Sequence, residues 1–176
     1  ACFIVIIINQ GLKKYGGDLA IGAFGIVNRL VFIVVMIVMG LNQGMQPIAG
    51  YNFGAKLYGR VNKVLRLTII YATAVTTFGF LVGMLVPDLV VGIFTSDAEL
   101  TELSVTGLRI TVMFFPIIGF QMVTSNFFQS IGMAGKAIFL SLTRQMLILL
   151  PCLLVLPQFF GVAGVWYSMP VSDLLA

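Results

Sequence analysis

The chain has 176 residues, of which 60% are hydrophobic and only 9% are charged. A soluble domain carries about 25% charged residues, so the composition excludes a soluble protein and predicts an integral membrane protein. With no histidine and only two cysteines, the chain lacks the usual ligands of a protein transition-metal site. The net charge of +4 does not indicate nucleic-acid binding, because membrane topology accounts for the cations.

Four stretches without Asp, Glu, Lys or Arg predict the membrane-spanning helices. They cover residues 30–55, 67–87, 110–135 and 145–172, and each reaches the roughly 20 residues that a helix needs to cross a bilayer. In chain order we predict a helix end, an outer loop and five helices, at 1–10, 11–17, 18–45, 62–86, 102–131, 137–157 and 161–176.

The predicted fold is an all-α polytopic bundle that forms one membrane domain over residues 1–176. It has about five full spans and partial terminal ones. Because residues 1–8 start in the middle of an apolar run and the last residues end inside another, we expect a piece of a longer membrane protein. Lipid is its expected surrounding.

Basic and acidic residues occupy alternate predicted loops. One loop holds Lys56, Arg60, Lys63 and Arg66, and the next loop on the same side holds Lys136 and Arg144. The loop between them holds Asp97, Glu99 and Glu102. The positive-inside rule then predicts that the loops near 56–66 and 132–137 are cytoplasmic and that 95–102 is external. Lys13 and Lys14 oppose this orientation but are outnumbered.

The predicted helix 18–45 carries a polar stripe. Steps of three or four residues connect Arg29, Phe32, Met36, Met39, Gln43 and Gln46. Lipid-facing stripes favour Leu, Ile and Val, so this one predicts a protein interior or a water-filled cavity. Simple interhelical packing remains the alternative for the amides and methionines. Arg29 either lines a cavity or extends to the outer interface.

The predicted helix 102–131 has a similar stripe, which contains Phe115, Gly119, Met122, Asn126 and Gln129. Pro116 removes a backbone donor opposite the carbonyl of Val112, so we predict a bend there. At the inner end of the helix, the amides of Asn126 and Gln129 can bridge to Gln46 and Asn52 as a gate. Capping of their own helix is the other interpretation.

Three motifs resemble one family. The stretch GLNQGMQPIAGYNFGAKLYGRV (40–61) resembles the end of the eighth helix in the multidrug and toxic compound extrusion (MATE) transporters. The stretch SNFFQSIGMAGKAIFLSLTRQ (125–145) resembles their turn between the tenth and eleventh helices, and FGVAGVWYSMPVSD (160–173) resembles their twelfth helix. The motifs occur in the order and spacing of the family, over almost the whole chain.

The resemblance implies a twelve-helix transporter of two six-helix lobes, of which this chain would be most of the C-terminal lobe. The N-terminal lobe would be its missing partner. The implied function is antiport, coupled to H⁺ or Na⁺, of amphipathic and cationic organic compounds out of the cell by alternating access of the two lobes. The substrate cavity would include Arg29, Met36, Met39, Gln43, Gln46, Met113, Phe120 and Met122. Pro47 and Asn52, with neighbouring glycines, would break the first of these helices and cap its carbonyls.

No carboxylate lies at a convincing midplane position for ion coupling. Asp173, near the cytoplasmic half of the last helix, and Asp88, beside Pro87, come nearest. We therefore expect the coupling ion to bind mainly in the missing lobe, and we expect no other cofactor. A flippase for lipid-linked sugars is the alternative in the same superfamily, a structural membrane subunit is a further one, and an enzyme would need a reactive cluster that the sequence lacks.

Overall fold

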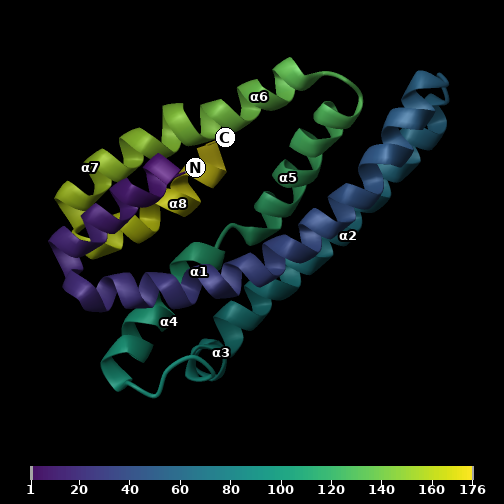
Figure 1. Cartoon of the computed structure of the whole chain (residues 1–176). Helices are drawn as coiled ribbons and strands as arrows, with labels where there is room; N and C mark the ends of the chain where they lie inside the picture. The colour runs from purple at the N-terminus through teal and green to yellow at the C-terminus, as the bar shows by residue number, and fades with distance from the viewer. Residues whose placement is uncertain (1, 176) are drawn as a thin grey trace.

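A computed structural model describes the backbone of residues 2–175, and all of their side chains except those of 2–5, 134, 140, 141 and 144–146. The described range is helical with short turns and contains no strand, which confirms the predicted all-α class. Figure 1 shows α1 and α2 as a long hairpin beside a group formed by α4 to α8. The elements are α1 Cys2–Gly54, α2 Tyr58–Leu85, α3 Pro87–Gly92, α4 Ala98–Val112, α5 Phe115–Ser130, α6 Ala134–Leu142, the π-helix η1 Thr143–Leu149, α7 Leu150–Phe160 and α8 Val162–Leu175.

Gly17 divides α1 into two arms that run in different directions (Figure 1). Its backbone has φ 66° and ψ −161°, a conformation that a residue without a Cβ adopts at little steric cost. The outer loop predicted at 11–17 is therefore too long, because residues 11–16 continue the first arm as a helix. A single glycine redirects the chain.

α1 extends well beyond its predicted end at residue 45 and runs through Pro47 to Gly54. The predicted helix break at Pro47 is wrong. Proline removes only one backbone hydrogen bond, and a membrane helix tolerates this loss where neighbouring helices pack against it. The packing is present here, because Met45 and Ala49 on either side of Pro47 are buried in the contact with α2 and α5.

The end of α1 is formed instead by Lys56, whose φ of 58° is left-handed. The N–H of Leu57 donates to the Asn52 carbonyl at 2.9 Å, and the N–H of Lys56 donates to the Phe53 carbonyl at 3.0 Å. These are the two bonds of a Schellman motif. The side-chain amide of Asn52 also donates to the carbonyl of Ile48 at 2.8 Å. Asn52 therefore caps this helix end both with its side-chain amide and with its backbone carbonyl.

α4 and α5 form one bent pair, with an angle of 53° at the break. The chain bends at Met113 and Phe114, where Phe114 has φ −108° and ψ 16°, and Pro116 lies in the first turn of α5. The expected bend is therefore a complete break, placed just before the proline. Proline is compatible with a first turn because the N–H that it lacks would have no partner there.

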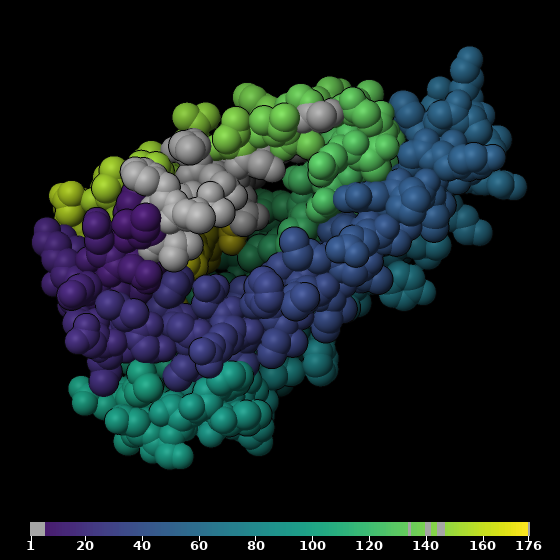
Figure 2. Space-filling view, viewed as in Figure 1, coloured from purple at the N-terminus to yellow at the C-terminus, as the bar shows by residue number. Residues whose placement is uncertain are grey.

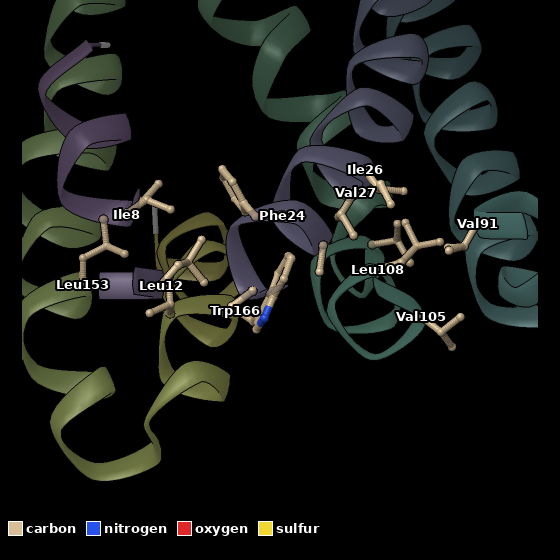
Figure 3. Close-up of a cluster of buried hydrophobic side chains, with 14 of the residues drawn as sticks. Ile8, Leu12, Phe24, Ile26, Val27, Val91, Val105, Leu108, Leu153 and Trp166 are labelled. Atoms are coloured by element: carbon tan, nitrogen blue, oxygen red, sulfur yellow. The ribbon is translucent and has the colours of Figure 1, made fainter. Parts of the chain in front are cut away.

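The largest core joins α1, α4 and α8 (Figure 3). Trp166 of α8 is only 2% exposed and lies beside Phe24 of α1, with ring centroids 5.7 Å apart. Gly107 of α4 permits this contact, because a Cβ there would lie 2.6 Å from the Trp166 ring. A second core joins α1, α2 and α5 through Val38, Met45, Ala49, Ala72 and Val123.

By length and hydropathy, α1 and α2 can each cross a membrane, and the bent pair α4–α5 can form a third span. The predicted spans 137–157 and 161–176 correspond to the stretch α6–η1–α7 and to α8, which are interrupted or shorter. The turns α1–α2 and α5–α6 lie at the upper end of the molecule in Figure 1, and the α3–α4 connection lies at the lower end. We call the upper one the basic end, because Lys56, Lys63 and Lys136 belong to it.

Candidate functional site

A cavity of 380 Å³ lies between α1 and α5, with α2, α4, η1 and α8 completing its wall. Figure 2 shows a hollow between α1 and α5 on one face of the molecule. Most of the lining side chains are aliphatic or aromatic, such as Val31, Val34 and Phe115. The polar lining residues are Asn28, Thr76, Thr111, Ser172 and Asp173. An apolar cavity with a few polar groups is typical of a small-molecule site.

Asp173 brings a carboxylate to this cavity from α8, where it is 8% exposed. The sequence analysis named it, with Asp88, as the nearest candidate for an ion-coupling carboxylate but did not assign it to a cavity. Its backbone carbonyl accepts a hydrogen bond of 2.6 Å from the Gln121 side chain of α5, which ties α8 to α5. The signal that could have found it is general, since an ionisable residue within an apolar helix usually faces a protein interior.

Of the residues predicted to line a substrate cavity, only Met122 lines this one. Arg29, Met36, Met39 and Gln43 are exposed along one stripe of α1, which no described part of the chain covers. Met113 and Phe120 are also exposed. Their role in a cavity between two lobes stays a prediction.

Gln46 and Asn126 connect α1 to α5 between the cavity and the basic end. The Gln46 Nε2 donates to the Asn126 Oδ1 at 3.2 Å, and the Asn126 Nδ2 donates to the Met122 carbonyl at 2.8 Å. The second bond orients the amide of Asn126 so that its oxygen faces Gln46. Gln129, the other predicted member of this gate, is exposed.

The two helices approach closely one turn beyond this bridge. A Cβ on Gly50 would lie 2.9 Å from the backbone oxygen of Ser130. Val38 and Met122 line the cavity, so the Gln46–Asn126 bridge and the contact at Gly50 close the α1–α5 interface between the cavity and the basic end. Whether this closure opens during a functional cycle stays a prediction.

Asn42 is a polar residue of this interface that the sequence did not distinguish from Gln43. It is 2% exposed, and neither atom of its amide has a hydrogen-bond partner among the described residues. It lies one helical turn from Val38 and one turn from Gln46, at the cavity end of the closure. A buried amide without a partner costs about 1–3 kcal/mol, so a bound water or a second arrangement of the interface is needed to account for Asn42.

Across the described part of the chain, no three His, Cys, Asp or Glu residues come together in a group that could hold a metal ion. The chemistry of the cavity is therefore that of one carboxylate, several hydroxyls and an amide in an apolar wall. Such a lining can bind and orient an organic molecule.

A family model described as MatE matches residues 2–154. The chain belongs to the MatE family. This membership confirms the resemblance carried by the three sequence motifs, and with it the helical membrane fold. The relatives described next are export proteins and transporters, which agrees with the lack of an enzyme-like reactive cluster in the sequence.

Two curated relatives are export proteins of staphylococci. Multidrug export protein MepA of Staphylococcus aureus (strain MSSA476) is 28% identical over 173 residues, which are 98% of this chain and 38% of MepA. MepA of Staphylococcus saprophyticus is 24% identical over 170 residues, which are 97% of this chain and 37% of that protein. The chain thus spans less than half the length of the curated relatives that it matches.

Solved structures of MATE transporters share the fold. The MATE multidrug transporter DinF-BH matches with a TM-score of 0.84 and 39% identity, over 98% of this chain and 39% of DinF-BH. The Vibrio cholerae MATE transporter VcmN matches with a TM-score of 0.88 and 20% identity, over 98% of this chain and 39% of VcmN. VcmN supports the fold alone at this level of identity.

Proposed function

We propose that this chain forms most of the C-terminal lobe of a MATE-type antiporter that exports amphipathic organic compounds, mainly cations, across the cytoplasmic membrane. Membership of the MatE family and the 39% identity to a multidrug transporter support this proposal. The observation that supports this function most strongly is the 380 Å³ cavity. It is mainly apolar, contains a carboxylate and is closed toward the basic end by contacts between α1 and α5. An apolar wall with a few polar groups suits an amphipathic organic molecule.

In this proposal the exposed stripe of α1 faces the other lobe, and the two lobes rock between outward-open and inward-open states. The Gln46–Asn126 bridge would belong to the closure on the cytoplasmic side. Inward movement of H⁺ or Na⁺ would drive export, with the main coupling carboxylate in the other lobe. Asp173 is the carboxylate that this chain contributes to its own cavity.

A flippase for lipid-linked sugars receives less support. A pyrophosphate substrate calls for several cations in the cavity, and the lining residues whose side chains the structure describes include neither Lys nor Arg. Arg29 is exposed on α1 outside this cavity.

Efflux of a fluorescent cationic dye from cells that express the full-length protein tests the proposal. We expect efflux that stops when one ion gradient is collapsed, and separate collapse of the proton and sodium gradients identifies the ion. The double variant Gln43→Leu with Gln46→Leu should reduce efflux more than it reduces the amount of protein in the membrane. Dye retention equal to that of cells without the protein would contradict the function.

A further inference from the structure

The first turns of α2 carry an open groove on the side turned away from the rest of the chain. Its volume is 470 Å³, and it is lined by Asn62, Lys63, Arg66, Leu67 and Ile70. These positions recur at a spacing of three or four, so they share one face of the helix. All five are exposed, whereas Val61, Thr68 and Ala72 are buried on the other face. We call this feature the α2 groove.

The α2 groove has a cationic end and an apolar end. Lys63 and Arg66 form one end together with the amide of Asn62, and Leu67 and Ile70 form the other. Within the described chain, neither Lys63 nor Arg66 makes a hydrogen bond or an ion pair. The sequence contains no Asp or Glu between residues 19 and 87, so a local carboxylate cannot neutralise them.

The length of α2 places the groove at a defined depth. Residues 67–85 of this helix carry no charge, and they rise by about 28 Å, close to the roughly 30 Å of a bilayer's hydrocarbon core. α2 is also one of the two single helices that can cross a membrane. Lys63 and Arg66 therefore lie at the level of the lipid headgroups, and Leu67 and Ile70 lie beside the start of the acyl chains.

The position of the hairpin leaves room for a lipid. The ends of α1 and α2 at the basic end extend beyond the other helices (Figure 1), and in the space-filling view they protrude from the body of the molecule (Figure 2). The exposed face of α2 continues below the groove with Tyr71, Phe78 and Leu81, which are apolar or aromatic. A lipid chain that starts in the groove can follow this face.

We propose that the α2 groove binds one anionic phospholipid. Its phosphate lies between the ammonium of Lys63 and the guanidinium of Arg66, because Arg donates two parallel hydrogen bonds to phosphate oxygens and Lys adds a point charge. Asn62 donates to the headgroup or the glycerol, and one acyl chain packs on Leu67 and Ile70. Basic pockets at the ends of membrane helices bind anionic headgroups by these interactions. The proposal requires membrane insertion and is independent of what the protein transports.

The test uses the full-length protein in a neutral detergent, titrated with dioleoyl phosphatidylglycerol and read by native mass spectrometry. Removing two headgroup cations, each worth about a five-fold change in affinity, should weaken the one-lipid adduct roughly thirty-fold in Lys63→Gln with Arg66→Gln. The matched control Lys56→Gln with Arg60→Gln removes the same charge from the same hairpin outside the groove. It should leave the affinity unchanged, and Lys63→Arg should retain binding.

Four results would overturn the proposal. If both double variants weakened lipid binding equally, the effect would come from the overall positive charge of the loop and not from the groove. Equal binding of dioleoyl phosphatidylcholine would show that charge is not recognised, and displacement by millimolar inorganic phosphate would show that the acyl chain contributes nothing. Absence of the adduct from the parent protein would contradict the site, and an unreactive thiol in Lys63→Cys would then show that another part of the protein covers the groove. Melting temperatures of the surface variants provide the control for folding.

Discussion

Lys56 and Gly132 end α1 and α5 in the same way, although the two residues differ in steric freedom. The φ angle is 58° at Lys56 and 80° at Gly132. In both turns, the N–H of the following residue bonds at 2.9 Å to a carbonyl of the last helical turn. Glycine adopts this left-handed conformation without steric cost, whereas a residue with a Cβ loses about 1–2 kcal/mol. The turn at Lys56 is therefore strained and the turn at Gly132 is not.

Replacing Lys56 by glycine should stabilise the protein. We expect a gain of about 0.5–1 kcal/mol, since relief of the left-handed strain exceeds the extra flexibility of glycine in the unfolded chain. Thermal unfolding of the detergent-solubilised full-length protein measures it. Gly132→Ala, the reciprocal change, should lower the melting temperature. A lower melting temperature for Lys56→Gly would show that the lysine side chain makes a stabilising contact outside this chain.

Asn126 should contribute to closure of the α1–α5 interface, and Gln129 should not. Asn126 bonds Gln46 at 3.2 Å, while Gln129 is exposed. Interhelical hydrogen bonds in membranes are worth about 0.6–1.7 kcal/mol, so Asn126→Ala should shift the open population about three- to eighteen-fold. Labelling of a reporter cysteine at position 28 from the cytoplasmic side, in a background without other cysteines, measures the shift.

The matched variant Gln129→Ala should leave this labelling rate at the parent value. A double-mutant cycle with Gln46→Leu should show that Asn126→Ala has no further effect once Gln46 is gone. Equal labelling of all these variants, alongside a lowered melting temperature for Asn126→Ala, would favour helix capping over gating.

At the scale of helices, α1 and α5 contact each other in the second core and nearer the basic end, and the cavity lies between them. Val38 and Val123 pack in the second core, and Gly50 meets the backbone of Ser130 nearer the basic end. The break before Pro116 turns α4 away from the line of α5 by 53°, and it brings Thr111 and Phe115 to the cavity wall. The shape of the cavity thus depends on one close contact and one break.

Gly50→Ala should force α1 and α5 apart. The added methyl group would lie 2.9 Å from a backbone oxygen that cannot rotate away, so we expect a loss of about 1–3 kcal/mol, typical of overpacking. Gly44→Ala is the control on the same helix, because no atom lies within 4 Å of a Cβ at that position. It should be neutral or slightly stabilising through higher helix propensity. Equal melting temperatures for the two variants would contradict the close contact.

At the scale of the whole molecule, the basic end and the opposite α3–α4 connection carry charges of opposite sign. The exposed cations Lys56, Lys63 and Lys136 lie at the basic end, and the acidic residues Asp97 and Glu99 lie near the opposite α3–α4 connection (Figure 1). The separation matches the alternate loops predicted from the sequence. Which end faces the cytoplasm stays a prediction that rests on the positive-inside rule.

Single cysteines test this orientation in intact cells. An impermeant maleimide should label Asp97→Cys and leave Lys63→Cys unlabelled until the membrane is permeabilised. We expect this result because cations near helix ends remain on the cytoplasmic side of bacterial membranes. The opposite labelling pattern would reverse the orientation and move the Gln46–Asn126 bridge to the outer side.

The sequence alone determined the membrane class, the approximate places of the main helices, and the family. These properties depend on local hydropathy, on charge and on short motifs, which a linear chain displays directly. It also located the bend near Pro116 and the polar residues at the end of α1. It did not determine that α1 passes through Pro47, because the tolerance of a helix for one lost hydrogen bond depends on the packing of its neighbours.

Only the tertiary structure decided which polar residues meet. Asn42 and Gln43 are adjacent in sequence but about 100° apart around the helix, and without the positions of α2 and α5 the buried one cannot be identified. Asn42 is buried and Gln43 is exposed. The cavity assembles Asn28, Thr76, Thr111 and Asp173 from four different helices. A cavity of this kind is a property of how distant segments pack, and no local pattern in any one of them specifies it.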